Sequence, residues 1–182
     1  PGTFSSDGIC VSCPSNRYSN SETGYSECIP CPDGHESNEG KTACVLCNPG
    51  TYSSDGGICV SCRQGYVSGR GSSECIPCQP GQNPNKDTIT VNGITYEPNS
   101  TCISCLPGEK SSDGICVECE DGFYSTIPSD SCSTCDPGKK PTNDKTACEQ
   151  CGEGTVSHYG RDCENCQPGW GPNTEKITND DG

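Results

Sequence analysis

The sequence has too few hydrophobic side chains to build one large core. Only 28% of its 182 residues are hydrophobic, and this fraction includes 20 cysteines. A globular domain of this length normally buries most of the surface of its unfolded chain around such a core. Few aliphatic and aromatic residues remain for that purpose. Something other than core burial must therefore hold the chain in shape.

Several signals of function are missing as well. No apolar run approaches the length of a membrane span, which predicts no membrane insertion within this segment. The chain has 11 basic against 25 acidic residues and a net charge of -14. This balance predicts no nucleic-acid binding, because phosphates must be neutralised by Lys and Arg. No nucleophile, base and orienting group stand out together, so we predict neither enzyme activity nor a cofactor. No signal peptide is present, so we expect a piece of a larger precursor.

Cysteine, in contrast, is abundant. A chain with more than about 8–10% cysteine is typical of a disulfide scaffold, and such scaffolds belong to oxidising compartments. We therefore predict a secreted, extracellular or cell-surface protein. All cysteines fall into ten C-x-x-C pairs: Cys10/Cys13, Cys28/Cys31, Cys44/Cys47, Cys59/Cys62, Cys75/Cys78, Cys102/Cys105, Cys116/Cys119, Cys132/Cys135, Cys148/Cys151 and Cys163/Cys166.

The pairs recur at nearly constant spacing. The gaps between them are 14, 12, 11, 12, 23, 10, 12, 12 and 11 residues, which indicates a tandem array of small repeats. Three types of repeat alternate: one begins Pro-Gly-Thr-aromatic-Ser, one ends Ser-Glu-Cys-Ile-Pro-Cys, and one ends Lys-Thr-Ala-Cys. Gly, Pro, Ser, Asn and Asp interrupt the sequence too often for helices. We predict small disulfide-rich tandem repeats of short β-strands and turns, with essentially no helix, forming an elongated rod without a single hydrophobic core.

The one long gap contains a hairpin signal. Residues 88–96 alternate β-branched side chains on both sides of Asn92-Gly93, a dipeptide that favours the type I′ turn of a two-residue hairpin. Residues 167–182 resemble the start of this insertion. We therefore divide the chain into CxxC repeats at 1–78, a longer hairpin-containing repeat at 79–101, CxxC repeats at 102–166 and a truncated hairpin-type repeat at 167–182. We expect the whole to be a fragment of a longer array.

Three chemistries use C-x-x-C pairs. Four-thiolate zinc sites have similar spacing, but an acidic surface would add to the negative charge of each site. A redox-active pair needs one motif on an α/β support, which ten motifs in a turn-rich chain do not provide. Structural disulfides fit best. Asn99-Ser100-Thr101 is an acceptor sequence for N-glycosylation at Asn99, as found in secreted proteins.

Two patterns of disulfide pairing are simple. In one, neighbouring pairs interlock as closed modules, such as Cys10–Cys28 with Cys13–Cys31. In the other, the second cysteine of each pair bonds the first of the next, and only Cys10 and Cys166 stay open. We favour this second pattern, a ladder, because it treats every repeat alike. Its links are Cys13–Cys28, Cys31–Cys44, Cys47–Cys59, Cys62–Cys75, Cys78–Cys102, Cys105–Cys116, Cys119–Cys132, Cys135–Cys148 and Cys151–Cys163.

Aromatic residues follow the second cysteine of many pairs by four or five positions. We expect them to cover the neighbouring disulfide and to add apolar contacts that one staple alone cannot supply. They are Phe4, Tyr18, Tyr52, Tyr66, Phe123, Tyr124 and Trp170.

The repeats that read Cys-x-Pro-Gly, followed by Cys-x-x-Cys, resemble a known family. Residues 47–62 and 105–119 show the pattern best. They are similar to the ephrin-receptor-like cysteine-rich repeats and, more distantly, to the cysteine-rich domains of tumour necrosis factor receptors. In those receptors the Cys-Pro-x-Gly cysteine closes onto the first cysteine of the next pair, which agrees with the ladder. Similar repeats occur in surface coats and flagellar hairs of protists and algae.

These observations lead to two hypotheses of function. The first is an extracellular structural protein, a disulfide-stapled rod that acts in a surface coat or filament. Its partners would be copies of itself, other matrix or coat proteins, and glycans. The alternative is a receptor ectodomain segment that binds a protein ligand. For that role the insertion, with Ile94 and Tyr96, is the candidate surface.

Overall fold

The structure is a computed structural model that describes residues 1–20, 22, 26–127 and 130–166. These residues form no helix, and they contain twenty short strands arranged in ten two-stranded sheets. This confirms the predicted fold class of small disulfide-rich repeats built from short strands and turns. None of the described residues belongs to a helix long and apolar enough to span a membrane. The predicted truncated repeat at 167–182 lies outside the described residues.

Each sheet pairs two strands, most of them neighbours in the sequence. The pairs are β1 (Thr3–Ser6) with β2 (Ile9–Ser12), β3 (Arg17–Tyr18) with β4 (Ile29–Pro30), β5 (His35–Ser37) with β6 (Cys44–Leu46), β7 (Thr51–Tyr52) with β8 (Val60–Ser61), β9 (Tyr66–Val67) with β10 (Ile76–Pro77), β11 (Gln82–Pro84) with β14 (Cys102–Ser104), β12 (Ile89–Val91) with β13 (Ile94–Tyr96), β15 (Glu109–Ser112) with β16 (Ile115–Glu118), β17 (Lys139–Pro141) with β18 (Cys148–Gln150), and β19 (Thr155–Val156) with β20 (Glu164–Asn165).

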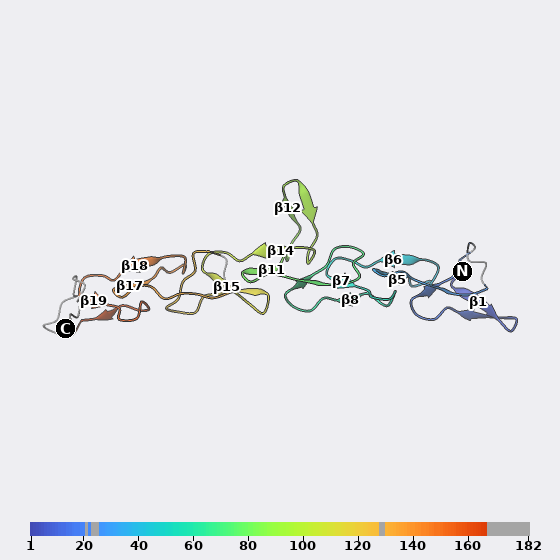
Figure 1. Cartoon of the computed structure of the whole chain (residues 1–182), viewed down its shortest axis with the longest axis horizontal. Coiled ribbons are helices and arrows are strands. Elements are labelled where there is room, and N and C mark those ends of the chain that lie inside the picture. The colour runs from blue at the N-terminus through green and yellow to red at the C-terminus, as the bar shows by residue number, and fades with distance from the viewer. Residues whose placement is uncertain (21, 23–25, 128–129, 167–182) are drawn as a thin grey trace, which may run out of the picture. The chain divides into compact units, whose positions relative to one another are not determined.

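The chain divides into two compact units. The first is Pro1–Ser104 with Asp113–Ile115, and the second is Cys105–Ser112 with the residues from Cys116 onward. Within each unit the sheets follow one another in chain order and do not surround a common core (Figure 1). Among the described residues, the buried hydrophobic side chains are those of Val67 and seven cysteines: Cys13, Cys28, Cys31, Cys47, Cys105, Cys119 and Cys135. Sulfur thus takes the place that aliphatic side chains hold in larger domains.

A tight turn begins most repeats. In Asn48-Pro49-Gly50-Thr51 the Thr51 amide donates a 3.0 Å hydrogen bond to the Asn48 carbonyl, and Gly50 has a φ of 76°. Proline followed by a positive-φ glycine is the signature of a type II turn. This turn reverses the chain just after Cys47 and starts strand β7.

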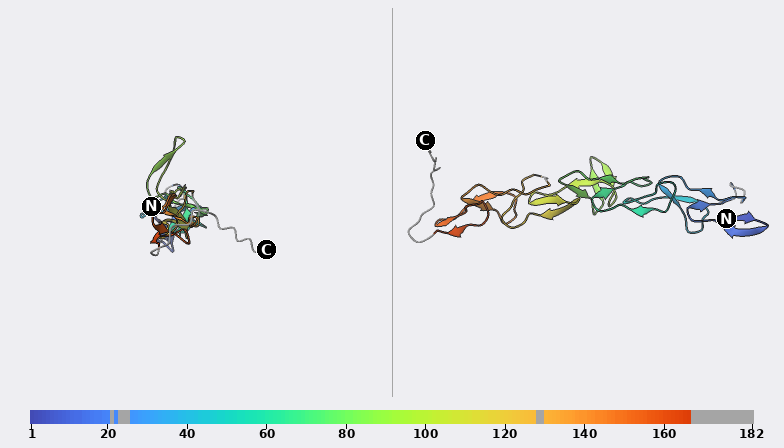
Figure 2. Two further views of the ribbon diagram at one scale, coloured as in Figure 1. Left: turned by 90° about the vertical axis from the view of Figure 1, so that its left-hand side faces the viewer. Right: turned by 60° about the horizontal axis from the view of Figure 1, so that its bottom comes forward.

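The insertion forms a separate hairpin. Strands β12 and β13 pair Ile89 with Tyr96 and Val91 with Ile94. The two turn residues have φ values of 51° at Asn92 and 79° at Gly93, as a type I′ turn requires. The hairpin projects sideways from the first unit, between β11 and β14 (Figures 1 and 2).

Candidate functional site

Nine disulfides join successive C-x-x-C pairs along the chain, and each closes one repeat. Each joins the second cysteine of one pair to the first cysteine of the next pair. The sequence separations range from 11 residues in Cys105–Cys116 to 24 in Cys78–Cys102. Closing a loop of about 12–16 residues stabilises a fold by about 3 kcal/mol in the chain-entropy account. The other links are Cys13–Cys28, Cys31–Cys44, Cys47–Cys59, Cys62–Cys75, Cys119–Cys132, Cys135–Cys148 and Cys151–Cys163. These nine links are those of the ladder.

The two remaining cysteines have free thiols. Cys10 is exposed and Cys166 is half-buried. Cys10 lies in strand β2, whose Ser12 pairs with Thr3 of strand β1. Strands β7 and β8 have the same register, with Thr51 paired with Ser61, and Cys59 stands where Cys10 stands. Cys10 therefore occupies the position that bears a disulfide in the fourth repeat.

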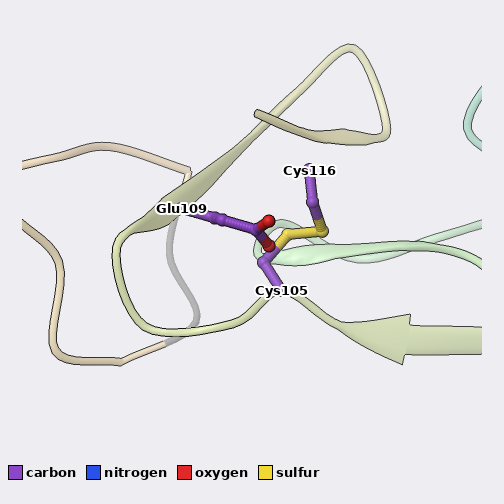
Figure 3. A group of neighbouring side chains, drawn as sticks. All are labelled: Cys105, Glu109 and Cys116. Atoms are coloured by element: carbon purple, nitrogen blue, oxygen red, sulfur yellow. A yellow bond between two sulfur atoms is a disulfide. The ribbon is translucent and has the colours of Figure 1, made fainter. Parts of the chain in front are cut away.

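One cluster has the composition of a metal site. Cys105, Glu109 and Cys116 bring their potential ligand atoms within 4.8 Å of one another. Figure 3 shows that the two sulfurs are joined to each other, so neither is a thiolate ligand. A Glu109 carboxylate oxygen accepts a 2.9 Å hydrogen bond from the backbone amide of Leu106. The cluster is thus a disulfide beside a turn-capping carboxylate. Because eighteen cysteines are bonded in this way, none of them has a free thiol for a zinc site or pairs within its own C-x-x-C motif as a redox-active pair would.

Buried serines dock one repeat onto the next. The amide of Gly50 donates a 3.0 Å hydrogen bond to the carbonyl of Ser68, and the Ser68 hydroxyl donates a 2.9 Å bond to the carbonyl of Thr51. Ser68 is only 1% exposed. The same amide-to-carbonyl contact recurs in both units, from Gly2 to Ser19, Gly34 to Ser53, Gly108 to Ser125 and Gly138 to Ser157. The sequence analysis did not predict these serines, although all five follow an aromatic or β-branched residue.

A second recurring contact reaches across two repeats. Lys41, Asn99 and Lys145 each stand three residues before the cysteine that closes their repeat, and their φ values are 52°, 60° and 57°. Each carbonyl accepts the amide of a buried serine: Ser19 to Lys41 at 3.0 Å, Ser68 to Asn99 at 3.1 Å and Ser125 to Lys145 at 3.0 Å. The three positions are therefore structurally equivalent. The long repeat therefore has the architecture of the repeats that end Lys-Thr-Ala-Cys, with a hairpin inserted in its turn.

Asn85 holds the base of that hairpin. Its side chain is fully buried. The amide nitrogen donates to the carbonyls of Asp87 at 2.9 Å and Glu97 at 2.8 Å, and the amide oxygen accepts the Thr101 N–H at 3.1 Å. Since both ends of the insertion are bound to one side chain, the hairpin leaves and rejoins the repeat at a fixed point.

Residues 2–37 match the family described as tyrosine-protein kinase ephrin type A/B receptor-like. The chain contains an ephrin-receptor-like cysteine-rich domain. No curated protein matches the chain. Beyond residue 37 most disulfides keep a similar spacing, consistent with further tandem cysteine-rich repeats. An ephrin-receptor-like domain and many disulfides indicate an extracellular or otherwise oxidising location. The match assigns residues 2–37 to a disulfide-bonded repeat and assigns them no catalytic family.

The predicted covering aromatics that the structure describes are half-buried. The Arg63 guanidinium lies 4.1 Å from the ring centre of Tyr66, and that of Arg161 lies 4.8 Å from the ring centre of Phe123. Such stacking is typical of a cation–π contact. The contacts seen for these two rings are therefore with arginine, and the predicted covering of disulfides stays a prediction. Trp170 lies outside the described residues.

Charged side chains reinforce the second unit. Lys145 forms ion pairs of 3.1 Å with Asp121 and 3.5 Å with Glu118, and its hydrogen bond with Asp121 raises the pKa of its ammonium. The hydroxyl of Thr142 donates a 2.6 Å bond to Asp144, and this bond, with those of Thr146, lowers the pKa of the Asp144 carboxyl. Both groups belong to the turn at Lys145, which is the position equivalent to Lys41 and Asn99 in the other repeats.

Proposed function

We propose that the chain is a segment of an extracellular structural protein, a disulfide-stapled rod that assembles into a surface coat or filament. The recurrence of one docking contact, from the turn glycine of a repeat to the buried serine of the next, supports this proposal most. In such an array each repeat contacts mainly its neighbours, so length is added without altering any existing contact. A spacer or coat protein needs this property.

The surface determines how association between copies of the chain would depend on salt. Large hydrophobic side chains are exposed singly along the repeats, with Ile9, Ile76 and Ile127 at 67%, 60% and 66% exposure. Each copy also carries a net charge of -14. Like charges repel, and salt screens them over about 10 Å at 0.1 M. We therefore expect association of copies to strengthen as ionic strength rises.

Solution scattering and electron microscopy of the secreted, oxidised chain test this function. We expect extended particles that associate side by side or end to end as protein and salt concentrations increase. Isolated, pliable particles at every concentration would contradict assembly. A compact sphere in solution scattering would contradict the rod.

The hairpin favours a second candidate, a receptor segment that binds a protein ligand. Neither β12 nor β13 pairs with any further strand of the described chain. Val91 and Ile94 are 49% and 57% exposed on it. A free strand edge with apolar side chains can accept a strand from a partner.

A hairpin exchange separates the two candidates. Residues 39–40 form the short turn of the equivalent repeat, so residues 86–98 can be replaced by Glu-Gly. The receptor hypothesis predicts that this variant loses its protein partner and still folds. The structural hypothesis predicts that the variant assembles like the parent chain. Retention of partner binding by the hairpin-free variant would rule out the receptor hypothesis in this form.

A further inference from the structure

Asn99 differs from its structural equivalents, Lys41 and Lys145, in the hydrogen bonds of its side chain. The ammonium of Lys41 donates to the carbonyl of Cys13, and that of Lys145 donates to the carbonyl of Cys119 at 2.6 Å. Each lysine thereby ties its repeat to a cysteine two repeats earlier. The asparagine side chain is too short for this reach. Within the described chain, the Asn99 side chain makes no hydrogen bond.

A hollow lies where the side chain of a lysine at position 99 would extend toward Cys62. It has a volume of about 390 Å³, and Pro49, Gly50, Cys62, Arg63 and Tyr66 line it together with Asn99. The Asn99 side chain lies against Gly50, since a methyl group added to that glycine would come within 2.8 Å of the Asn99 Cβ. The hollow combines a tyrosine ring, a stacked guanidinium and backbone groups. A hollow of this volume has room for a small organic group attached to Asn99.

The residues around Asn99 meet the requirements of a modification site. Asn99-Ser100-Thr101 is an N-glycosylation acceptor sequence. Asn99 is exposed and turns the chain with a φ of 60°. The hydroxyl of Ser100 is used locally, in a 2.5 Å bond to the Glu97 carbonyl. The acceptor sequence and the hollow are independent observations that coincide at one side chain.

We propose that Asn99 carries an N-linked glycan whose first N-acetylglucosamine fills this hollow, in place of the lysine found in the equivalent repeats. The donor is a lipid-linked oligosaccharide diphosphate. The Asn99 Nδ2 forms a bond to C1 of the sugar, the bond from C1 to the diphosphate oxygen breaks, the lipid diphosphate leaves, and the amide nitrogen loses one proton. The sugar ring packs on Tyr66, and its polar groups face Arg63 and the backbone around Cys62. This modification depends on the extracellular function proposed above.

The first experiment asks whether the glycan is present. The chain is secreted from a eukaryotic cell, treated with an amidase that converts glycosylated Asn to Asp in heavy-oxygen water, and analysed by peptide mass spectrometry. We expect heavy Asp at position 99. Thr101→Ala should abolish the label because it destroys the acceptor sequence, while Ser100→Ala should keep it. An oxidised, secreted chain with unmodified Asn99 would overturn the glycan and leave the extracellular proposal standing. Free thiols in the chain isolated from its own cells would overturn both.

The second experiment asks where the first sugar lies. An endoglycosidase leaves one N-acetylglucosamine on Asn99, and the Thr101→Ala variant has none while it keeps Asn99 itself. We expect the Tyr66 ring signals in NMR spectra and the hydrogen-exchange rate of the Ser68 amide to be the same for the full glycan and the single sugar. In the Thr101→Ala variant the Tyr66 signals should shift, and the Ser68 amide should exchange several-fold faster. Identical signals and rates in all three forms would place the sugar in solvent and contradict its position in the hollow.

Discussion

The hydroxyl of Ser68 donates a 2.9 Å hydrogen bond to the carbonyl of Thr51 in the preceding repeat. Ser157 is equally buried, at 1% exposure, and follows Val156 as Ser68 follows Val67, but its hydroxyl has no partner among the described residues. The two serines therefore hold equivalent positions, and their hydroxyls differ in hydrogen bonding. They form a matched pair for measuring how much the hydroxyl contributes to docking.

Ser68→Ala should weaken the docking of its repeat, and Ser157→Ala should not. Removing the Ser68 hydroxyl leaves the Thr51 carbonyl without that bond, which costs about 1 kcal/mol. Native-state hydrogen exchange of the Gly50 amide, which bonds to Ser68, should then speed up roughly fivefold. The Gly138 amide should exchange at an unchanged or slower rate in Ser157→Ala. Equal acceleration in both variants would show that the serine backbone, and not its hydroxyl, carries the contact.

Asn85→Ala should release the base of the inserted hairpin. The substitution removes three hydrogen bonds from a fully buried side chain, so the local cost should be about 1–3 kcal/mol or more. Limited proteolysis should cut residues 86–98 faster in this variant. Thr90→Val is the control, because it removes only the exposed 3.2 Å contact between the Thr90 and Thr95 hydroxyls. Unchanged cleavage in Asn85→Ala would contradict the clamp.

Thr142→Val should raise the pKa of the Asp144 carboxyl toward its usual value of 3.8, because the bond from the Thr142 hydroxyl is the largest cause of the lowered value. A lowered pKa in the folded state favours folding above the unfolded pKa and loses this contribution as pH falls through the folded pKa. The variant should therefore lose less stability on acidification than the parent chain. NMR titration of Asp144 measures the shift, and an unchanged midpoint would contradict the assigned cause.

Replacing Cys47 and Cys59 together by Ser should loosen the repeat they close and leave distant repeats intact. The lost link closed a separation of 12 residues, for which the chain-entropy account gives about 3 kcal/mol. In a nearest-neighbour array this loss stays local. Hydrogen exchange should increase around residues 47–62 and remain unchanged around residues 135–148. Uniform exposure of the whole chain would instead indicate one cooperative core.

Spacing and turn chemistry predicted much of this fold. A pairing pattern that is the same in every repeat predicts links such as Cys13–Cys28. The Asn92-Gly93 dipeptide predicts the hairpin turn. Both predictions succeed because they depend on local chain geometry. The docking serines were not predicted, since serine is common throughout the chain and only the packing of neighbouring repeats buries a few of them. The equivalence of Asn99 with Lys41 and Lys145 was hidden by the insertion that precedes it. Its recognition required the shared positive φ and the shared hydrogen bond from a buried serine.

The most direct test of this account is disulfide mapping of the secreted chain by mass spectrometry after thiol alkylation without reduction. The account predicts links of the Cys13–Cys28 type along the whole described chain, with alkylation confined to Cys10 and Cys166 in the isolated chain. Paired links such as Cys10–Cys28 with Cys13–Cys31, or thiols that react freely throughout, would contradict the ladder and the extracellular rod built on it.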